Sequence, residues 1–329
     1  MDTRLDETNG LIGEIRAAAA RLEGHAVRTP LLQSESLSRR VGGRILIKAE
    51  PLQKTGSFKY RGAFNFIAQM TPEEKKRGVV AFSSGNHAQG VALAATEAGC
   101  PAVVVMPADA PALKIARTRA FGAEVVLYDR WREDREAIAR TIAQERGSVL
   151  IPPFDHPRII AGQGTVGLEA ADEARALGLS VDTFVVCCGG GGLTAGSATA
   201  VADAFPEARL YAAEPEAFDD TARSLRAGER LDIVPGGTSF CDALLGRLGE
   251  LTFAVNRRLL SGVALVSDAE VAEAMRAAFL ELKVVVEPGG AVALAAVLSG
   301  KVDCRDRTVL VVLSGGNVDP AQFAGVLGG

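Results

Sequence analysis

Residues 79–106, VVAFSSGNHAQGVALAATEAGCPAVVVM, contain the pattern that decides the fold of this chain. A short β-branched run (79–84) precedes an Ala-rich amphipathic segment (87–98), and a second β-branched run (101–106) follows. Strand, helix and strand in this order predict a parallel sheet with helices on both faces. Because the unit recurs along the chain, we expect an α/β fold with parallel-rich, twisted sheets.

The recurring units fall into two groups. In the first group, strands are expected at 79–84, 101–106, 124–128 and 149–151, and helices at 87–98, 111–120 and 132–146. In the second group, strands are expected at 43–49, 183–188, 209–214, 263–266 and 308–313, and helices at 163–177, 193–204, 268–282 and 290–298. The first helix is expected near Ser57, after the strand at 43–49. A chain of 329 residues exceeds one small core, so we expect a small domain (78–152) within a large domain (1–77 and 153–329).

The composition excludes several classes of protein. The net charge is −4 and no run of Lys or Arg stands out, so no nucleic-acid partner is expected. The acidic start (1–10) is unlike a secretory signal, and the apolar runs are too short to span a membrane. Five cysteines without metal-ligand spacing are expected to be reduced thiols in a cytoplasmic protein. They are Cys100, Cys187, Cys188, Cys241 and Cys304.

Polar or glycine-rich turns follow four of the expected strands. They are Ser83–His87 (SSGNH), the glycines 189–192, the acidic turn after Glu214, and Ser314–Asn317 (SGGN). Ligands of open α/β sheets bind beyond the carboxyl ends of the strands. We therefore expect these turns to converge on one site.

The run Gly189, Gly190, Gly191 and Gly192 lies between an expected strand and an expected helix. Without Cβ atoms, its backbone N–H groups can point at one anion, and the helix N-terminus adds a favourable dipole. No Lys-Ser/Thr pair follows, so a nucleoside triphosphate loop is excluded, and the match to a dinucleotide-binding pattern is loose. A tight turn that merely needs glycine is the alternative, but we favour a cradle for a monophosphate.

Lys59 lies at the start of an expected helix, in GSFKYRGA (56–63). This is the positive end of the helix dipole, where a structural cation is disfavoured. The same field, with partial burial, would lower the pKa of the amine and make it a nucleophile. Taken alone, however, Lys59 is better explained as a solvated lysine among 36 Lys and Arg residues.

Two further turns contain candidate functional residues. Asn86 can donate to a phenolate or carboxylate oxygen, and the hydroxyl of Ser84 could move a proton. Capping of the following helix is the simpler explanation for each. Glu214 and Asp220, with Asp219 beside them, have a spacing that suits oxygen ligands of a hard cation. On spacing alone, a solvated acidic loop is the better explanation, because 40 acidic residues make close pairs common.

Seven motifs in order resemble the serine/threonine dehydratase and serine racemase family. They are GSFKYRGA (56–63), SSGNHAQG (83–90), PPFDHPRIIAGQGT (152–165), GGGGLTAG (189–196), AAEPEAFDD (212–220), VVEPGG (285–290) and LSGGNVD (313–319). The resemblance covers nearly the whole chain, from Arg28 to Asp319. These fold-type-II enzymes depend on pyridoxal-5′-phosphate (PLP), so the resemblance implies a two-domain, tryptophan-synthase-β-like fold. Each motif alone is modest evidence, but seven in the right order are specific.

The resemblance implies a role for each motif. Lys59 would carry PLP as a Schiff base, with Phe58 against the ring, Asn86 on the PLP hydroxyl, Ser314 at the pyridine nitrogen and Glu287 near the ring. The phosphate would be held by Gly189, Gly190, Gly191, Gly192 and Leu193. The substrate carboxylate would be received by Ser83, Ser84, Gly85, Asn86 and His87, with Arg135 as a second contact. In the racemase branch, Glu214, the carbonyl of Phe218 and Asp220 bind Mg²⁺ or Mn²⁺, which favours a magnesium site here.

The implied reaction is a β-elimination. Lys59 would remove the α-proton, PLP would absorb the resulting charge, and the β-hydroxyl would leave. A neutral Ser314 at the pyridine nitrogen would leave that nitrogen unprotonated, which favours prompt loss of the hydroxyl over a long-lived carbanion. We therefore expect a threonine/serine ammonia-lyase (dehydratase), a carbon–oxygen lyase that converts L-threonine or L-serine to a 2-oxo acid and ammonia.

Several residues leave rival functions open. Many threonine dehydratases have Ala where Ser84 stands, whereas the racemase and 3-hydroxyaspartate dehydratase branches have Ser. There the hydroxyl could act as a catalytic proton donor opposite Lys59. The segment 237–242 (GTSFCD) and Gly289–Gly290 also depart from the family pattern. The alternatives are a 3-hydroxyaspartate dehydratase, a serine or aspartate racemase, a β-replacement enzyme and, remotely, a non-catalytic PLP-binding protein. The resemblance further implies a homodimer in amino-acid metabolism. Because the sequence ends at residue 329, we expect no C-terminal regulatory domain of the kind that biosynthetic threonine dehydratases have.

Overall fold

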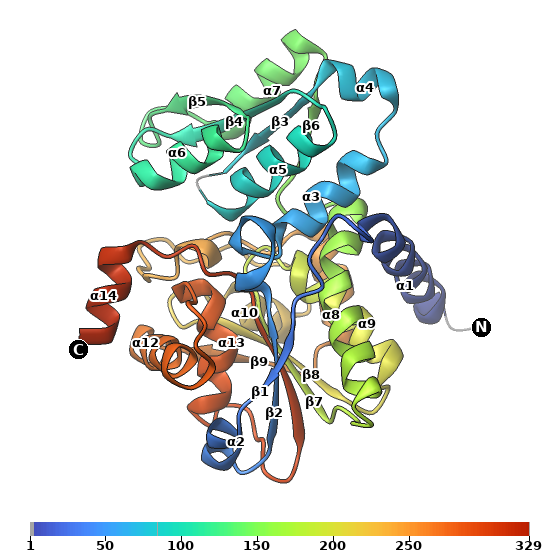
Figure 1. Cartoon of the computed structure of the whole chain (residues 1–329), viewed down its shortest axis with the longest axis vertical. Helices are drawn as coiled ribbons and strands as arrows, with labels where there is room; N and C mark the ends of the chain where they lie inside the picture. Colours follow the sequence, from blue (N-terminus) through green and yellow to red (C-terminus); the bar gives the residue numbers. More distant parts are fainter. Residues whose placement is uncertain (1–2, 84, 329) are drawn as a thin grey trace.

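The computed structural model describes residues 3–83 and 85–328, with side chains described from residue 10 onward. The strands in this part of the chain form two separate sheets, one of six strands and one of four. Figure 1 shows the smaller sheet and its helices above the larger sheet, with α3 (Lys59–Ala68) lying between them. The chain therefore leaves the large unit, builds the small one and returns.

The six-stranded sheet has the order β1-β2-β10-β7-β8-β9. Its strands are β1 (Leu31–Gln33), β2 (Arg44–Ala49), β7 (Thr183–Cys187), β8 (Arg209–Pro215), β9 (Gly262–Val266) and β10 (Thr308–Leu313). Neighbouring strands are parallel except β1 and β2. Val309 of β10 pairs with Ile45 on one side and Thr183 on the other. The last strand of the chain thus lies inside the sheet.

The four-stranded sheet has the order β5-β4-β3-β6 and is parallel throughout. Its strands are β3 (Val79–Phe82), β4 (Ala102–Pro107), β5 (Glu124–Tyr128) and β6 (Val149–Leu150). All four lie within the stretch 78–152 that the sequence predicts as a small domain. The α/β fold class with parallel-rich sheets and flanking helices is therefore confirmed.

Helices cover both faces of each sheet (Figure 1). The helices of the small unit are α4 (Pro72–Arg77), α5 (Asn86–Glu97), α6 (Ala112–Ala120) and α7 (Arg135–Arg146). Around the large sheet lie α1 (Thr3–Leu22), α2 (Glu35–Val41), α8 (Pro157–Ala176), α9 (Gly192–Ala204), α10 (Asp220–Ala227), α11 (Glu250–Leu259), α12 (Asp268–Ala277), α13 (Pro288–Leu298) and α14 (Pro320–Gly328). In the pair α8 and α9, glycine permits a close approach, because a Cβ added at Gly196 would lie 2.3 Å from the carbonyl oxygen of Ile160.

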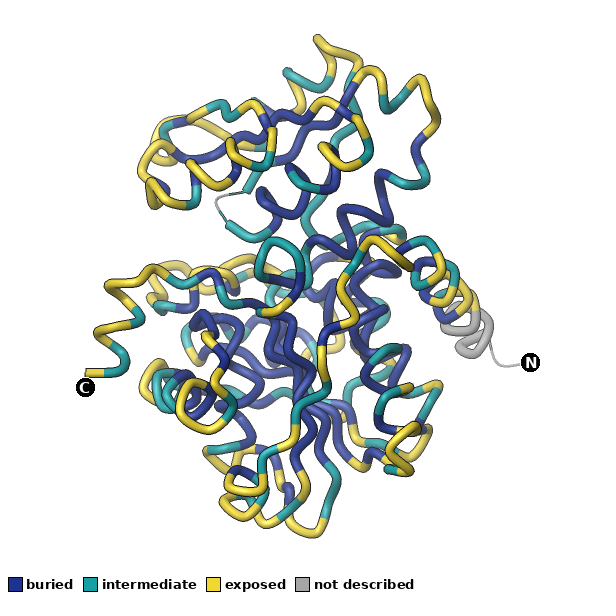
Figure 2. Tube along the Cα trace, in the orientation of Figure 1, coloured by how far each residue is buried: buried dark blue, intermediate teal, exposed yellow. Residues whose placement is uncertain are grey.

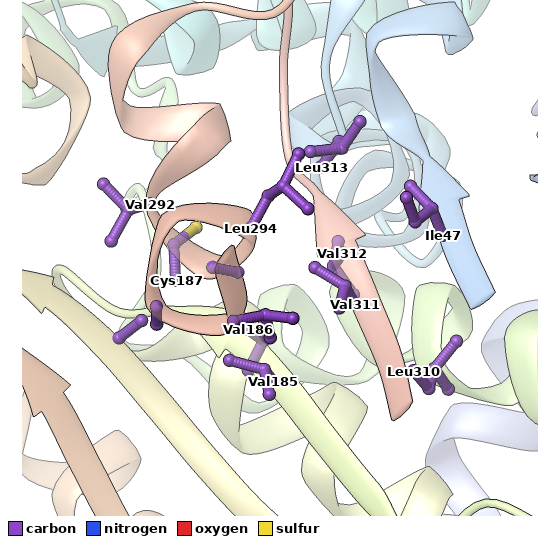
Figure 3. Close-up of a cluster of buried hydrophobic side chains, with 14 of the residues drawn as sticks. Ile47, Val185, Val186, Cys187, Val292, Leu294, Leu310, Val311, Val312 and Leu313 are labelled. Atoms are coloured by element: carbon purple, nitrogen blue, oxygen red, sulfur yellow. The ribbon is translucent and has the colours of Figure 1, made fainter. Parts of the chain in front are cut away.

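The main core lies between the large sheet and its helices, and Figure 2 shows the sheet strands buried along their central parts. α13 consists of small and aliphatic residues that are buried from Pro288 to Val297. Figure 3 shows part of this core, formed by Val185 and Val186 of β7, Val292 and Leu294 of α13, and Val311 and Val312 of β10. Burial of such a side chain contributes about 1.5–3 kcal/mol, so this core anchors the strand ends that bear the site.

The expectation that no helix precedes the strand at 43–49 is wrong, since α1 and α2 lie before it. The acidic residues at the start of α1 obscure its apolar periodicity in the sequence. The apolar face of this helix includes the buried Ile12, Ile15 and Leu22. The helix bounds also differ from the expected ones where a capping side chain sets the start of the helix. α7 begins at Arg135, because the Asp134 carboxylate accepts hydrogen bonds from the next turn.

Two further expectations concern the cysteines and membrane-spanning segments. All five cysteines are free and buried, in agreement with the expectation of reduced thiols. Among the residues that the structure describes, no helix has the length and apolar character needed to cross a membrane.

Candidate active site

The turns after β3 and β10 meet at Gly315. A Cβ added there would lie 2.3 Å from Oε1 of Glu287, 3.1 Å from the Cβ of Ser57 and 3.2 Å from Nδ2 of Asn86. These residues belong to four segments, namely the loop before α3, the start of α5, the N-cap of α13 and the turn after β10. Glycine is needed at this point because a side chain would displace the polar groups that converge on it.

Lys59 is the first residue of α3 and is half-buried. Its Nζ donates to the carbonyl oxygen of Pro153 at 2.7 Å and lies 5.1 Å from the centre of the Phe58 ring. Burial lowers the pKa of Lys59 from 10.5 to about 8, against the opposing effects of Cys187 and Glu287. The amine is therefore partly uncharged near neutral pH, which suits a nucleophile better than a solvated surface lysine.

The glycine run 189–192 joins β7 to α9, as expected. Gly191 has a φ of 86°, in the left-handed region that favours glycine, and a Cβ added at Gly190 would lie 2.3 Å from the Phe154 ring. In the described part of the chain, the N–H groups of the run and of the first turn of α9 make no hydrogen bond to another segment. Such free donors at a helix N-terminus suit an anion.

Asn86, Glu287 and Asn317 form a hydrogen-bonded chain. Nδ2 of Asn86 donates to Oε1 of Glu287 at 2.5 Å, and Nδ2 of Asn317 donates to Oδ1 of Asn86 at 2.8 Å. The N-cap of α5 is Gly85, and α5 has no side-chain capping hydrogen bond, so capping does not explain Asn86. Burial raises the pKa of Glu287 to about 7. These hydrogen bonds fix the amide of Asn86 at the point where the two turns meet.

Ser314, directly after β10, is buried beside β7. Its Oγ accepts a hydrogen bond from Sγ of Cys187 at 3.3 Å, and its carbonyl oxygen accepts one from the N–H of Phe58 at 3.2 Å. Burial raises the pKa of Cys187 to about 11, so the thiol keeps its proton at neutral pH. Ser314 therefore links the ends of β7 and β10 to the segment that bears Lys59.

The expected substrate loop lies at the start of α5. The N–H of Gly85 donates to Oγ of Ser83 at 3.2 Å. The His87 ring lies 3.1 Å from the carbonyl oxygen of Ile151, and burial lowers the pKa of His87 to about 3, so the ring is neutral. Ser84 lies outside the described residues. Backbone amides at the start of a helix can receive a carboxylate, so this loop stays the expected carboxylate site.

Arg135 lies at the edge of this loop. It is exposed at the start of α7, and its guanidinium carbon is 5.6 Å from the centre of the Phe82 ring. Phe82 is the last residue of β3 and directly precedes Ser83. The stacking contact holds a cation next to the expected substrate loop.

Glu214 and Asp220 are buried behind the glycine run rather than exposed in a loop. Glu214 accepts two backbone hydrogen bonds from α10, and Asp220 accepts one from the N–H of Leu248 at 2.8 Å. Burial raises the pKa of Glu214 to about 8, and the charge of Asp220 adds to the rise. Phe218 lies between them in the sequence. Among the described residues, no group of three or more His, Cys, Asp or Glu could hold a metal, so the expected set offers two carboxylates and one carbonyl.

Several residues at the site were missed by sequence reasoning. Pro153 supplies the acceptor for Lys59, and Nε2 of Gln163 lies 3.4 Å from the same oxygen. Asp242, within the segment that departs from the family pattern, forms an ion pair with Lys114 of α6 at 2.5 Å. The motif PPFDHPRIIAGQGT contains Pro153 and Gln163, but only the folded chain brings them to Lys59.

The residues present fit PLP. The glycine run offers free N–H donors for a phosphate, Lys59 offers a reactive amine for an aldehyde, and Asn86 and Ser314 offer polar atoms between them. Two buried polar atoms, Oγ of Ser57 and Oε1 of Gln163, have no partner among the described residues. Orphaned buried atoms are costly in a native protein, so they are expected where a ligand completes the structure.

Comparisons with known proteins agree with this fit. Residues 22–315 match the family described as "Pyridoxal-phosphate dependent enzyme". The L-threo-3-hydroxyaspartate ammonia-lyase of Pseudomonas sp. is 46% identical over 96% of this chain and 98% of its own length. The L-threonine ammonia-lyase of Thermotoga maritima is 42% identical over 93% of this chain and 75% of its own. Maize serine racemase is a similar solved structure, with a TM-score of 0.91, 39% identity and 95% coverage of both chains.

The sequence-based prediction of the family is therefore confirmed, and it rests on nearly the whole chain. The chain belongs to the PLP-dependent enzymes of fold type II, in the group that contains the ammonia-lyases of hydroxy amino acids and the serine racemases, and PLP is its cofactor.

Proposed function

We propose that this chain is an ammonia-lyase that eliminates water from a β-hydroxy α-amino acid and releases a 2-oxo acid and ammonia. The observation that carries the proposal is Lys59, an amine whose pKa is lowered to about 8 by burial beside two strand-end turns. At pH 7 about a tenth of such an amine is uncharged, so it can both attack a carbonyl and accept a proton.

The residues that would hold PLP follow from the site. Lys59 would hold its aldehyde carbon, Gly189–Gly192 and Leu193 its phosphate, Asn86 its hydroxyl and Ser314 its ring nitrogen. Phe58 and Glu287 would flank the ring. When bound, PLP supplies an electron sink for the charge left at the substrate α-carbon. Once the substrate amine has taken its place, Lys59 would take the α-proton.

We propose L-threo-3-hydroxyaspartate as the first substrate to test, ahead of L-threonine and L-serine. The amides at the start of α5 would receive the α-carboxylate. Arg135, held on Phe82 at the edge of the same loop, would receive a second carboxylate, which neither L-threonine nor L-serine has. The relative from Pseudomonas, named for hydroxyaspartate, supports this order.

A panel of the hydroxyaspartate isomers, L-threonine, L-serine and D-serine, scored for 2-oxo acid, tests this proposal. Wild type should act on a hydroxy amino acid and Lys59→Ala should not. Arg135→Ala should raise KM for hydroxyaspartate more than for L-threonine, because only the former has the second carboxylate. Equal effects on both substrates would contradict the role of Arg135.

Racemisation is the second candidate activity, favoured by the likeness to maize serine racemase. Ser84 would return a proton to the α-carbon on the face opposite Lys59. Chiral analysis of the serine left after incubation should show both enantiomers with wild type and one with Ser84→Ala. Racemisation that survives in the variant would overturn the role of Ser84.

We also propose a Mg²⁺ or Mn²⁺ site at Glu214, the carbonyl of Phe218 and Asp220. Two buried carboxylates close together favour a bound cation, since burial without a counter-charge is costly. The Sγ of Cys188, next to the glycine run, lies 3.3 Å from Oγ1 of Thr221 in α10. Because Thr221 follows Asp220, a cation bound at Asp220 would also stabilise the glycine run. Chelation should lower thermal stability and Mg²⁺ should restore it. An unchanged melting curve would count against the site.

A homodimer is proposed as the assembly. Leu52 and Val285 are exposed apolar residues next to the turn after β10, and Phe279 and Leu280 are exposed in the helical segment Ala278–Leu282 that precedes Val285. Gly316 brings their segments together, because a Cβ added there would lie 2.6 Å from the Val285 carbonyl oxygen and 3.0 Å from the Pro51 side chain. Light scattering should give twice the mass of 34.3 kDa. A monomer would refute the proposal.

A further inference from the structure

We propose that Cys187 is a positioning residue that aims the hydroxyl hydrogen of Ser314 at the ring nitrogen of PLP. The inference rests on the proposed function, because it requires PLP with its ring nitrogen at Ser314. It concerns a buried thiol to which the family resemblance assigns no role.

The geometry places the two side chains at adjacent strand ends. Cys187 is the last residue of β7, Ser314 directly follows β10, and these strands are paired in parallel with Val311 opposite Val185. Both residues are 4% exposed, and Sγ of Cys187 lies 3.3 Å from Oγ of Ser314. Cys187 belongs to the same buried apolar cluster as Val292 and Leu294 of α13, and Figure 3 shows all three. This packing leaves the thiol little freedom to turn away.

The number of hydrogens decides what Ser314 can do. A hydroxyl has one hydrogen and two lone pairs. Among the described residues, Sγ of Cys187 is the hydrogen-bond partner of Oγ of Ser314. If the thiol donates to that oxygen, the hydroxyl hydrogen is free to donate to a ring nitrogen. If the hydroxyl instead donates to sulfur, only a lone pair remains, and the ring nitrogen must then carry a proton.

Two observations favour the first arrangement. Burial raises the pKa of Cys187 to about 11, so the thiol keeps the hydrogen that it donates. The pyridine nitrogen is also a stronger acceptor than a thiol sulfur, so the hydroxyl hydrogen gains more by pointing at the ring. A chain from S–H to O–H to N polarises each bond in the same sense. Cys187 thereby makes Ser314 a donor and keeps the ring nitrogen unprotonated.

The matched control is Cys188, the adjacent residue of the same segment. Cys188 is 1% exposed, and its Sγ contacts Thr221 rather than Ser314. Cys187→Ala and Cys188→Ala therefore remove the same atom from two equally buried positions. Cys187→Ser keeps a donor of similar size, so it should restore what Cys187→Ala loses.

The test uses holoenzyme reconstituted with PLP that carries ¹⁵N at the ring nitrogen, and NMR reports whether that nitrogen is protonated. We expect an unprotonated nitrogen in wild type, Cys188→Ala and Cys187→Ser. In Cys187→Ala the Ser314 hydroxyl loses the S–H donor that polarises it and becomes a weaker donor to the ring, so we expect a shift toward the protonated value at the same pH. The dissociation constant of PLP should rise about two- to tenfold in Cys187→Ala, as for loss of one hydrogen bond.

The outcomes separate this inference from the proposed function. A protonated nitrogen in wild type, or the same ¹⁵N shift in Cys187→Ala as in wild type, overturns the role of Cys187 alone. If Cys187→Ala does not fold, Cys187→Ser decides, because a protonated nitrogen in that variant also overturns the inference. Failure of wild type to acquire visible absorbance with PLP, or absorbance that persists in Lys59→Ala, would instead refute the proposed function.

Discussion

Replacement of Lys59 by methionine should change how the stability of the cofactor-free protein depends on pH. In the folded chain, burial lowers the pKa of Lys59 from 10.5 to about 8, whereas the unfolded chain has the ordinary value of about 10.4. Between these values the unfolded chain binds more protons at Lys59 than the folded chain does. The free energy of unfolding of wild type therefore rises with pH through this window, and the variant lacks that contribution.

The magnitude follows from the two pKa values. A lowering from 10.5 to about 8 corresponds to roughly 3 kcal/mol, at about 1.4 kcal/mol for each pH unit. Because Lys59 is half-buried, solvent screening reduces this figure. We expect wild type to gain about 2 kcal/mol relative to Lys59→Met between pH 7 and pH 10. Loss of the hydrogen bond to Pro153 adds an offset that is similar at each pH, so it cancels.

Urea unfolding of the two stripped proteins at several pH values from 7 to 10 measures this gain. Lys54→Met controls for removing a lysine from the same segment, since Lys54 pairs with Glu97 at the surface at 2.7 Å. A difference between wild type and Lys59→Met that stays constant over this range would refute the lowered pKa. It would also remove the physical reason given for the reactivity of Lys59.

Three other variants test the packing around the site. Arg61→Met should destabilise the protein by about 3–5 kcal/mol in urea unfolding, because it removes the guanidinium that lies 2.8 Å from the buried Glu50 and leaves that carboxylate without a charged partner; a loss below about 1 kcal/mol would contradict this. Gly190→Ala should weaken PLP binding about tenfold or more in a spectroscopic titration, since the new Cβ would overlap the Phe154 ring, and unchanged affinity would argue against this loop as the phosphate cradle. Lys114→Met should cost less than about 1 kcal/mol, because its partner carboxylate is 54% exposed, so a loss above about 2 kcal/mol would be inconsistent with a surface pair.

The local features of the fold could be predicted from the sequence. Strands of a parallel sheet are buried on both faces, so they appear as continuous apolar runs such as 308–313, and the expected bounds there agree with β10. The glycine run between a strand and a helix was also recognisable. α1 was missed because its acidic residues obscure the apolar periodicity, and the start of α7 was misplaced because a capping carboxylate sets it.

The site could be predicted in outline but not in its contacts. Lys59 and its acceptor Pro153 are 94 residues apart, and Asn86 and Glu287 are 201 residues apart. No local pattern encodes such pairs, so capping remained the simpler explanation of Asn86 until the structure placed its amide on Glu287. The same applies to Cys187, which appears in the sequence only as one of five cysteines.

The position of β10 has a consequence for biosynthesis. Thr308 pairs with Arg44 and Leu313 with Ala49, so the strand made last joins one of the first to leave the ribosome. Until it emerges, β2 and β7 have no common neighbour, and Ser314 is absent from the site. A nascent chain should therefore be unable to complete the cofactor site before residue 314 has left the ribosome, and until the chain folds Lys59 also lacks the burial that lowers its pKa.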